Sequence, residues 1–107
     1  MLRGNLRRGL ALVRRRTHRG PALAVRLYER PGCHLCEETH RALRRIGLDR
    51  ALAIERVDIT RDEALERRYL VRIPVLAVGA AELDAAGLDD AGLARWLGDV
   101  ADRAALS

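Results

Sequence analysis

An apolar run leads directly into a pair of cysteines in the segment Leu27-Tyr28-Glu29-Arg30-Pro31-Gly32-Cys33-His34-Leu35-Cys36. Leu23, Val25 and Leu27 alternate with other residues, which is typical of a β-strand that ends at Tyr28. Pro31-Gly32 then predicts a turn. Beyond Cys33, side chains recur at the spacing of an amphipathic helix that Gly47 ends: Leu35, Thr39, Ala42, Leu43 and Ile46. Strand, turn and helix are therefore predicted to meet at the cysteines.

A Cys-x-x-Cys pair at the start of a helix favours thiol redox chemistry. The free amide groups and the positive end of the helix dipole lower the pKa of such a cysteine from about 8.5 to roughly 3.5–7.5. We expect Cys33 to attack a disulfide and Cys36 to resolve the mixed disulfide, with no tightly bound cofactor. Arg30 and a protonated His34 would add positive charge near the Cys33 sulfur, although His34 can equally be an exposed loop residue.

The two cysteines could also belong to a zinc site, a haem-attachment motif or a structural disulfide. A zinc site would need further ligands, and His18, His34 and His40 are the only histidines in the chain. A haem-attachment motif is excluded because Glu37, not His, follows Cys36. A structural disulfide across so short a loop would stabilise the fold only weakly. We therefore assign no metal ligands.

The rest of the chain continues the alternation of strands and helices. Strands are predicted at residues 53–57 and 75–78, the second buried on both faces, with a hairpin partner at residues 81–83. Between them, Thr60-Arg61-Asp62-Glu63 has the form of a capping box for a helix that runs to about Tyr69. Asp89 or Asp90 caps a last helix. Its apolar stripe consists of Leu93, Trp96, Leu97, Val100 and Ala104. The order is β-α-β-α-β-β-α.

Charge is distributed unevenly over the 107 residues. Residues 1–20 hold seven of the 20 basic residues and no acid, so 13 basic and 15 acidic residues remain in residues 21–107. The net charge of that part is −2, which does not indicate a basic groove for nucleic acid. We expect one domain at residues 21–107. Residues 1–20 form an Arg-rich tail: a disordered arm, a partly helical basic segment, or the product of a start codon placed too far upstream.

The cysteine content and hydropathy favour a cytoplasmic protein. Two cysteines are too few for a disulfide scaffold, and no apolar run approaches the roughly 20 residues that a membrane span requires. We therefore expect a cytoplasmic protein without a membrane span. We also expect it to be a monomer.

Three segments together resemble the short bacterial glutaredoxin-like proteins of the thioredoxin superfamily over about residues 23–100. They are residues 27–36, with the two cysteines, then Val57-Asp58, and Tyr69-Leu70-Val71-Arg72-Ile73-Pro74-Val75. The resemblance implies a thioredoxin-like α/β fold with three layers, α/β/α, and a four-stranded mixed sheet. It also implies a disulfide oxidoreductase that acts on protein disulfides or glutathione, with a thiol reductant system as its partner.

The resemblance also implies roles for individual residues. Pro74 is expected to be cis and to face the cysteines, while the backbone of Ile73 pairs with an extended substrate such as glutathione or a peptide. Arg30 matches the position where glutaredoxins carry a Lys that meets a glutathione carboxylate. Arg72 is either a further anion contact or a solvated side chain. The predicted site thus has two catalytic residues, Cys33 and Cys36, and six substrate-binding residues: Arg30, His34, Leu35, Arg72, Ile73 and Pro74.

Two other functions stay open at this point. One is a carrier of an iron–sulfur cluster or another metal bound through Cys33. The other is a thioredoxin-fold adaptor whose basic tail binds nucleic acid or a membrane, with the cysteines incidental.

Overall fold

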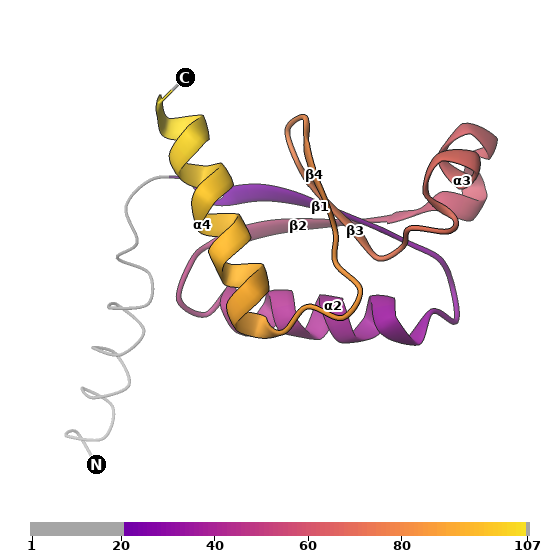
Figure 1. Cartoon of the computed structure of the whole chain (residues 1–107), viewed down its shortest axis with the longest axis horizontal. Coiled ribbons are helices and arrows are strands. Elements are labelled where there is room, and N and C mark those ends of the chain that lie inside the picture. The colour runs from indigo at the N-terminus through magenta and orange to yellow at the C-terminus, as the bar shows by residue number, and fades with distance from the viewer. Residues whose placement is uncertain (1–20, 107) are drawn as a thin grey trace, which may run out of the picture.

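The computed structural model describes residues 21–106, so the predicted N-terminal tail lies outside the described residues. The elements follow one another as β1 (Leu23–Glu29), α2 (His34–Ile46), β2 (Leu52–Asp58), the 3-10 turn η1 (Ile59–Arg61), α3 (Glu63–Tyr69), β3 (Val75–Val78), β4 (Ala81–Asp84) and α4 (Asp90–Leu106) (Figure 1). The predicted order of strands and helices is confirmed. The turn η1 is an addition, and β1 continues one residue beyond the predicted end, to Glu29.

The four strands form one mixed sheet in the order β2-β1-β3-β4. β1 is parallel to β2 and antiparallel to β3, and β3 is antiparallel to β4. Val75 at the start of β3 therefore pairs with Tyr28 near the end of β1 and with Asp84 at the end of β4. As a result, the loops after β1 and β4 and the loop before β3 emerge at the same edge of the sheet.

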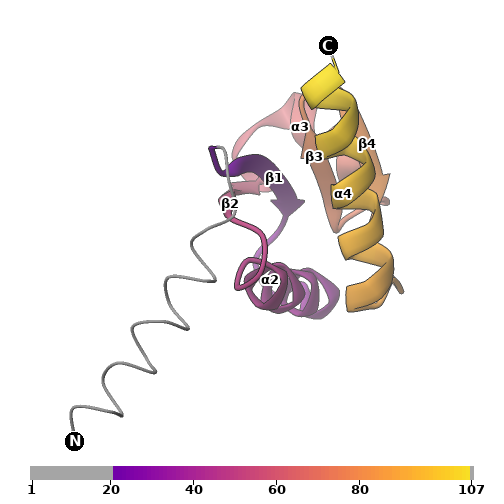
Figure 2. The ribbon, with the colours of Figure 1, turned by 90° about the vertical axis from the view of Figure 1, so that its left-hand side faces the viewer.

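Helices cover both faces of the sheet, which confirms the three-layer α/β/α architecture. On one face, α2 and α4 cross at a steep angle (Figure 2) and share a core with β1 and β3: Val25, Leu27, Ala42, Leu43, Leu76, Ala85, Leu93 and Leu97. On the other face, η1 and α3 pack through Tyr28, Ile59, Tyr69, Val75 and Ala77. Successive side chains of a strand point to opposite faces, so Leu27 and Tyr28 enter different cores.

The predicted apolar stripes of α2 and α4 are confirmed except at one end of each, where Leu35 and Ala104 are exposed. In α2, Leu35 is 47% exposed because it lies on the first turn and lines an open groove instead of the core. In α4, Leu93, Leu97 and Val100 are buried, but Ala104 is exposed. Ala104 lines a cavity together with Val78 and Ala81 of the β3–β4 hairpin, so this end of the stripe faces the hairpin but is not buried in the core.

The predicted capping box at Thr60 and Glu63 is also wrong. Thr60 lies within η1, and α3 begins at Glu63 with Asp62 as its N-cap. The Asp62 carboxylate accepts hydrogen bonds from the amides of Ala64, at 2.8 Å, and Leu65, at 3.2 Å. An Asp directly before the helix satisfies two amides that have no partner within the helix, which leaves no capping role for Thr60.

Replacing Asp62 with alanine should lower the free energy of unfolding by about 1 kcal/mol, because two amides of the first turn lose their acceptor. Urea unfolding of Asp62→Ala measures this loss. Thr60→Ala is the matched comparison and should cost less, since the Thr60 hydroxyl donates only to Asp58, at the protein surface. A larger loss for Thr60→Ala than for Asp62→Ala would contradict this capping assignment.

Candidate active site

The two cysteines lie at the start of α2, as predicted. Cys33 is the N-cap residue, and its Sγ accepts a hydrogen bond from the Cys36 amide at 3.2 Å. The two residues form a disulfide, with 5.2 Å between their Cα atoms. Cys36 is fully buried, whereas Cys33 is partly exposed. A partner molecule can therefore reach Cys33 but not Cys36, and an amide already points at the sulfur that would carry the negative charge.

The loop between β1 and α2 holds Cys33 in this position. Gly32 has φ of 77°, a left-handed conformation that favours glycine, and the Cys33 amide donates to the carbonyl of Arg30 at 3.3 Å. The turn predicted from Pro31-Gly32 is thus present. Arg30 is exposed and borders a small cavity of about 160 Å³ beside this loop.

The two residues between the cysteines point outward. His34 has 80% of its side chain exposed, and its Nε2 lies 3.1 Å from a carboxylate oxygen of Glu38, one helical turn further along α2. Leu35 is exposed on the first turn of the same helix. Each of them is accessible to a molecule that approaches Cys33.

The Ile73–Pro74 peptide is cis, as the resemblance implied. The Pro74 carbonyl accepts a hydrogen bond from the amide of Ala85 at 2.8 Å, which ties the start of β3 to the loop after β4. The Ile73 amide donates to the carbonyl of Tyr69 at 3.0 Å. An extended substrate could pair with the Ile73 amide only if this hydrogen bond broke. The hydrogen bond to Tyr69 therefore restricts the substrate-binding role expected of the Ile73 amide.

Arg72 forms ion pairs with two carboxylates of the same fold. Its guanidinium lies 3.1 Å from a carboxylate oxygen of Glu82 and 2.8 Å from one of Asp84. It also lies 5.3 Å from the ring centroid of Tyr69. The positive charge expected to contact a substrate anion is therefore neutralised within the fold, by carboxylates of β4 that are 10 and 12 residues further along the chain.

Two stacked tyrosines hold α3 on the sheet beside this arginine. The rings of Tyr28 and Tyr69 are 4.1 Å apart with an interplanar angle of 14°. The Tyr69 hydroxyl donates to a carboxylate oxygen of Glu82. Burial, followed by this hydrogen bond, raises the pKa of Tyr69 to about 12, while the same bond lowers the pKa of Glu82. The stack and the hydrogen bond fix the end of α3, from which the chain enters the cis peptide.

A groove of about 470 Å³ lies between α2 and the segment that connects β4 to α4, and it is lined by Leu35 but by neither cysteine. The residues that line it from α2 include Leu35, Thr39 and Ala42, and those from the connecting segment include Ala85, Leu88 and Asp89. Sequence reasoning assigned no site residue to the connecting segment. Its position follows from the pairing of β3 with β4, and no motif within it indicates a role.

The described part of the chain contains neither a cluster of metal-binding side chains nor a membrane-spanning helix. Within residues 21–106, no group of three or more His, Cys, Asp or Glu side chains could hold a metal ion, so Cys33, Cys36 and His40 do not form such a group. No helix in the same range is long and apolar enough to cross a membrane.

The fold and the position of the cysteine pair define a thioredoxin-like α/β protein with a Cys-x-x-Cys motif at a helix N-terminus. The family model described as Glutaredoxin-like domain (DUF836) matches residues 24–98, and the chain belongs to this family.

Solved structures agree with this assignment. An X-ray structure of Northeast Structural Genomics target protein XcR50 from X. campestris is similar, with 38% sequence identity and a TM-score of 0.63, covering 70% of this chain and 96% of that chain. A solution structure of XcR50 gives 39% identity and a TM-score of 0.61, covering 71% and 94% of the two chains. No curated protein matches the sequence.

Proposed function

We propose that this protein is a thiol–disulfide oxidoreductase that uses Cys33 and Cys36 as a dithiol. The observation that carries the proposal is the asymmetry of the pair: Cys33 is partly exposed at the N-cap of α2, and Cys36 is buried one turn away. An exposed sulfur beside helix amides suits the attacking thiolate, and a buried neighbour within bonding distance suits the resolving thiol.

The reaction proceeds in two exchanges. The Cys33 thiolate attacks a substrate disulfide, RS–SR′, and a Cys33–SR bond forms while R′S⁻ leaves. The Cys36 thiolate then attacks the Cys33 sulfur, so that the Cys33–Cys36 disulfide forms and RS⁻ leaves. Two electrons pass to the substrate, and the two protons of the dithiol end on the two released thiols. Two equivalents of a low-molecular-weight thiol, or one protein dithiol, return the protein to its reduced form.

The surroundings of Cys33 favour disulfides of proteins or of glutathione as substrates. The groove between α2 and the β4–α4 segment reaches Leu35, which lies between the two cysteines in the chain. Its apolar part, with Leu35 and Leu88, can accept the chain that flanks a substrate sulfur. Arg30 is an exposed cation three residues before Cys33 and suits a substrate carboxylate. This chemistry needs no metal or organic cofactor, and it suits a cytoplasmic monomer.

An equilibrium redox titration tests the proposal, together with turnover of a glutathione mixed disulfide and of a protein disulfide. We expect a reversible two-electron transition near the roughly −200 to −230 mV of glutaredoxins, with turnover of at least one substrate. A pair with no reversible transition, or one that exchanges with neither substrate, would exclude this function.

A further inference from the structure

A buried carboxylate lies directly before the cysteine loop. Glu29 ends β1, four residues before Cys33, and only 7% of the residue is exposed. Arg56 of β2 holds it with two hydrogen bonds, from Nε to Oε2 at 2.6 Å and from Nη2 to Oε1 at 2.9 Å. A paired geometry of this kind compensates the cost of burying the carboxylate charge.

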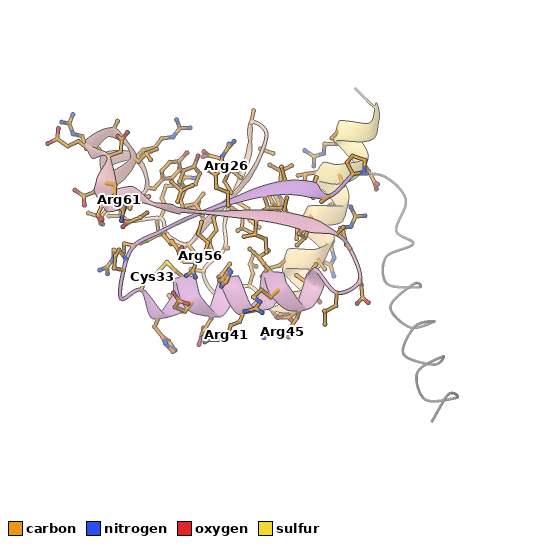
Figure 3. All side chains as sticks on the ribbon, turned by 180° about the vertical axis from the view of Figure 1, so that it is seen from behind. Arg26, Cys33, Arg41, Arg45, Arg56 and Arg61 are labelled. Carbon is orange, nitrogen blue, oxygen red and sulfur yellow. A yellow bond between two sulfur atoms is a disulfide. The ribbon has the colours of Figure 1, made fainter. Side chains whose placement is uncertain are left out.

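The same guanidinium also reaches the first turn of α2. Arg56 Nη2 donates to Oε1 of Glu37 at 2.6 Å. Glu37 directly follows Cys36, and its amide donates to the Cys33 carbonyl at 3.1 Å. Figure 3 shows Arg56 between β2 and α2 near the end of the helix where Cys33 lies. One side chain thus connects the end of β1 to the turn of helix that contains both cysteines.

The cluster Glu29–Arg56–Glu37 carries a net charge of −1, since two carboxylates share one guanidinium. Half of the Glu37 side chain is exposed, compared with 39% for Arg56 and 10% for Glu29. The charge of the cluster therefore acts on the cysteine pair partly through the protein, and water screens it only in part.

Most other charged groups near the cysteine pair lie against a side chain of opposite charge. His34 pairs with Glu38, and Arg72 pairs with Glu82 and Asp84. Partial burial, followed by the charge of Arg56, lowers the pKa of His40, which favours its neutral form. The remaining groups that border the cysteine loop are Arg30 and Asp58. The cluster is thus the charged group most directly tied to the first turn of α2.

We infer that the Glu29–Arg56–Glu37 cluster sets the thiolate stability and reduction potential of the Cys33–Cys36 pair, with Arg56 as its positioning residue. The inference rests on the proposed redox function. Reduction by two glutathione molecules breaks the Cys33–Cys36 bond, releases glutathione disulfide and leaves a thiolate at Cys33, whereas the oxidised pair is uncharged. Negative charge nearby therefore favours the disulfide, and positive charge favours the dithiol.

Opposite charge changes should have opposite effects. Glu37→Gln removes a negative charge and should lower the Cys33 pKa by about half a unit, while Arg56→Gln should raise it by a similar amount. The exchange equilibrium with glutathione should shift about threefold, toward the dithiol in Glu37→Gln and toward the disulfide in Arg56→Gln. A threefold change corresponds to about 14 mV, at about 29.6 mV per tenfold for a two-electron couple. Thiolate ultraviolet absorbance against pH and glutathione titration measure the two quantities.

Glu63→Gln is the matched control. Glu63 is also a carboxylate in the first turn of a helix, and it also pairs with an arginine, Arg67, at 3.6 Å, but it lies on α3. It should leave the Cys33 pKa and the exchange equilibrium unchanged. Shifts of the same sign in Glu37→Gln and Arg56→Gln, or equal shifts in Glu37→Gln and Glu63→Gln, would overturn the inference.

Two further outcomes are distinguishable. If Arg56→Gln does not fold, the comparison of Glu37→Gln with Glu63→Gln decides alone, because both carboxylates are at least half exposed. If the wild-type protein turns over no disulfide but the two variants shift the Cys33 pKa in opposite directions, the proposed function fails and the electrostatic effect of the cluster stands.

Discussion

Replacing Cys33 with serine should reduce disulfide turnover on the order of a thousandfold or more, to near the uncatalysed rate. A serine hydroxyl does not ionise at neutral pH and cannot form a disulfide with the substrate, so the first exchange is lost. Cys36 does not replace it because its side chain is fully buried. Turnover of a glutathione mixed disulfide by the reduced variant measures the effect.

Cys36→Ser is the matched comparison because it removes the other sulfur of the same pair. It should keep part of the activity toward a glutathione mixed disulfide, since a second glutathione molecule can resolve the Cys33–SR intermediate in place of Cys36. With a protein disulfide, the intermediate should accumulate as a covalent complex that a reducing agent releases. The reverse pattern, with activity kept in Cys33→Ser and lost in Cys36→Ser, would contradict the assigned roles.

The largest loss of stability is expected from truncation of the core beneath α2. Leu43 is fully buried between α2, α4 and the sheet, so Leu43→Ala removes apolar contacts and leaves a cavity. The free energy of unfolding should fall by about 2–5 kcal/mol. Small domains have a total of only about 5–15 kcal/mol, so the variant should be close to unfolding at physiological temperature.

Leu48→Ala provides the matched control for this loss. Leu48 follows α2, and 51% of it is exposed, so the same truncation should change the free energy of unfolding by less than about 0.5 kcal/mol. Chemical denaturation of both variants in the oxidised state measures the difference. Equal losses at the two positions would show that α2 does not pack on the sheet as described.

Local patterns in the sequence were sufficient for the order of elements and for the position of the cysteine pair. Strand alternation, the helical stripe and the turn glycine each depend on residues a few positions apart, and the resulting elements have nearly the predicted bounds. The two errors in the predicted elements both lie at the ends of helices. Asp62, next to the helix start, takes the place of Thr60 as the cap, and Ala104, near the end of α4, stays exposed although it lies beside the β3–β4 hairpin.

The surroundings of the cysteines depend on contacts between residues that are far apart in the chain. Arg56 meets Glu29 and Glu37 across 27 and 19 residues, and Arg72 is neutralised by carboxylates of β4. These pairs depend on strand order and register, since each strand places charged side chains beside those of its neighbour. A stretch of sequence carries the period of its own strand or helix but not the register in which strands pair. The motif at Cys33 and Cys36 could therefore be identified by inspection, whereas the charges and the groove around it required the folded structure.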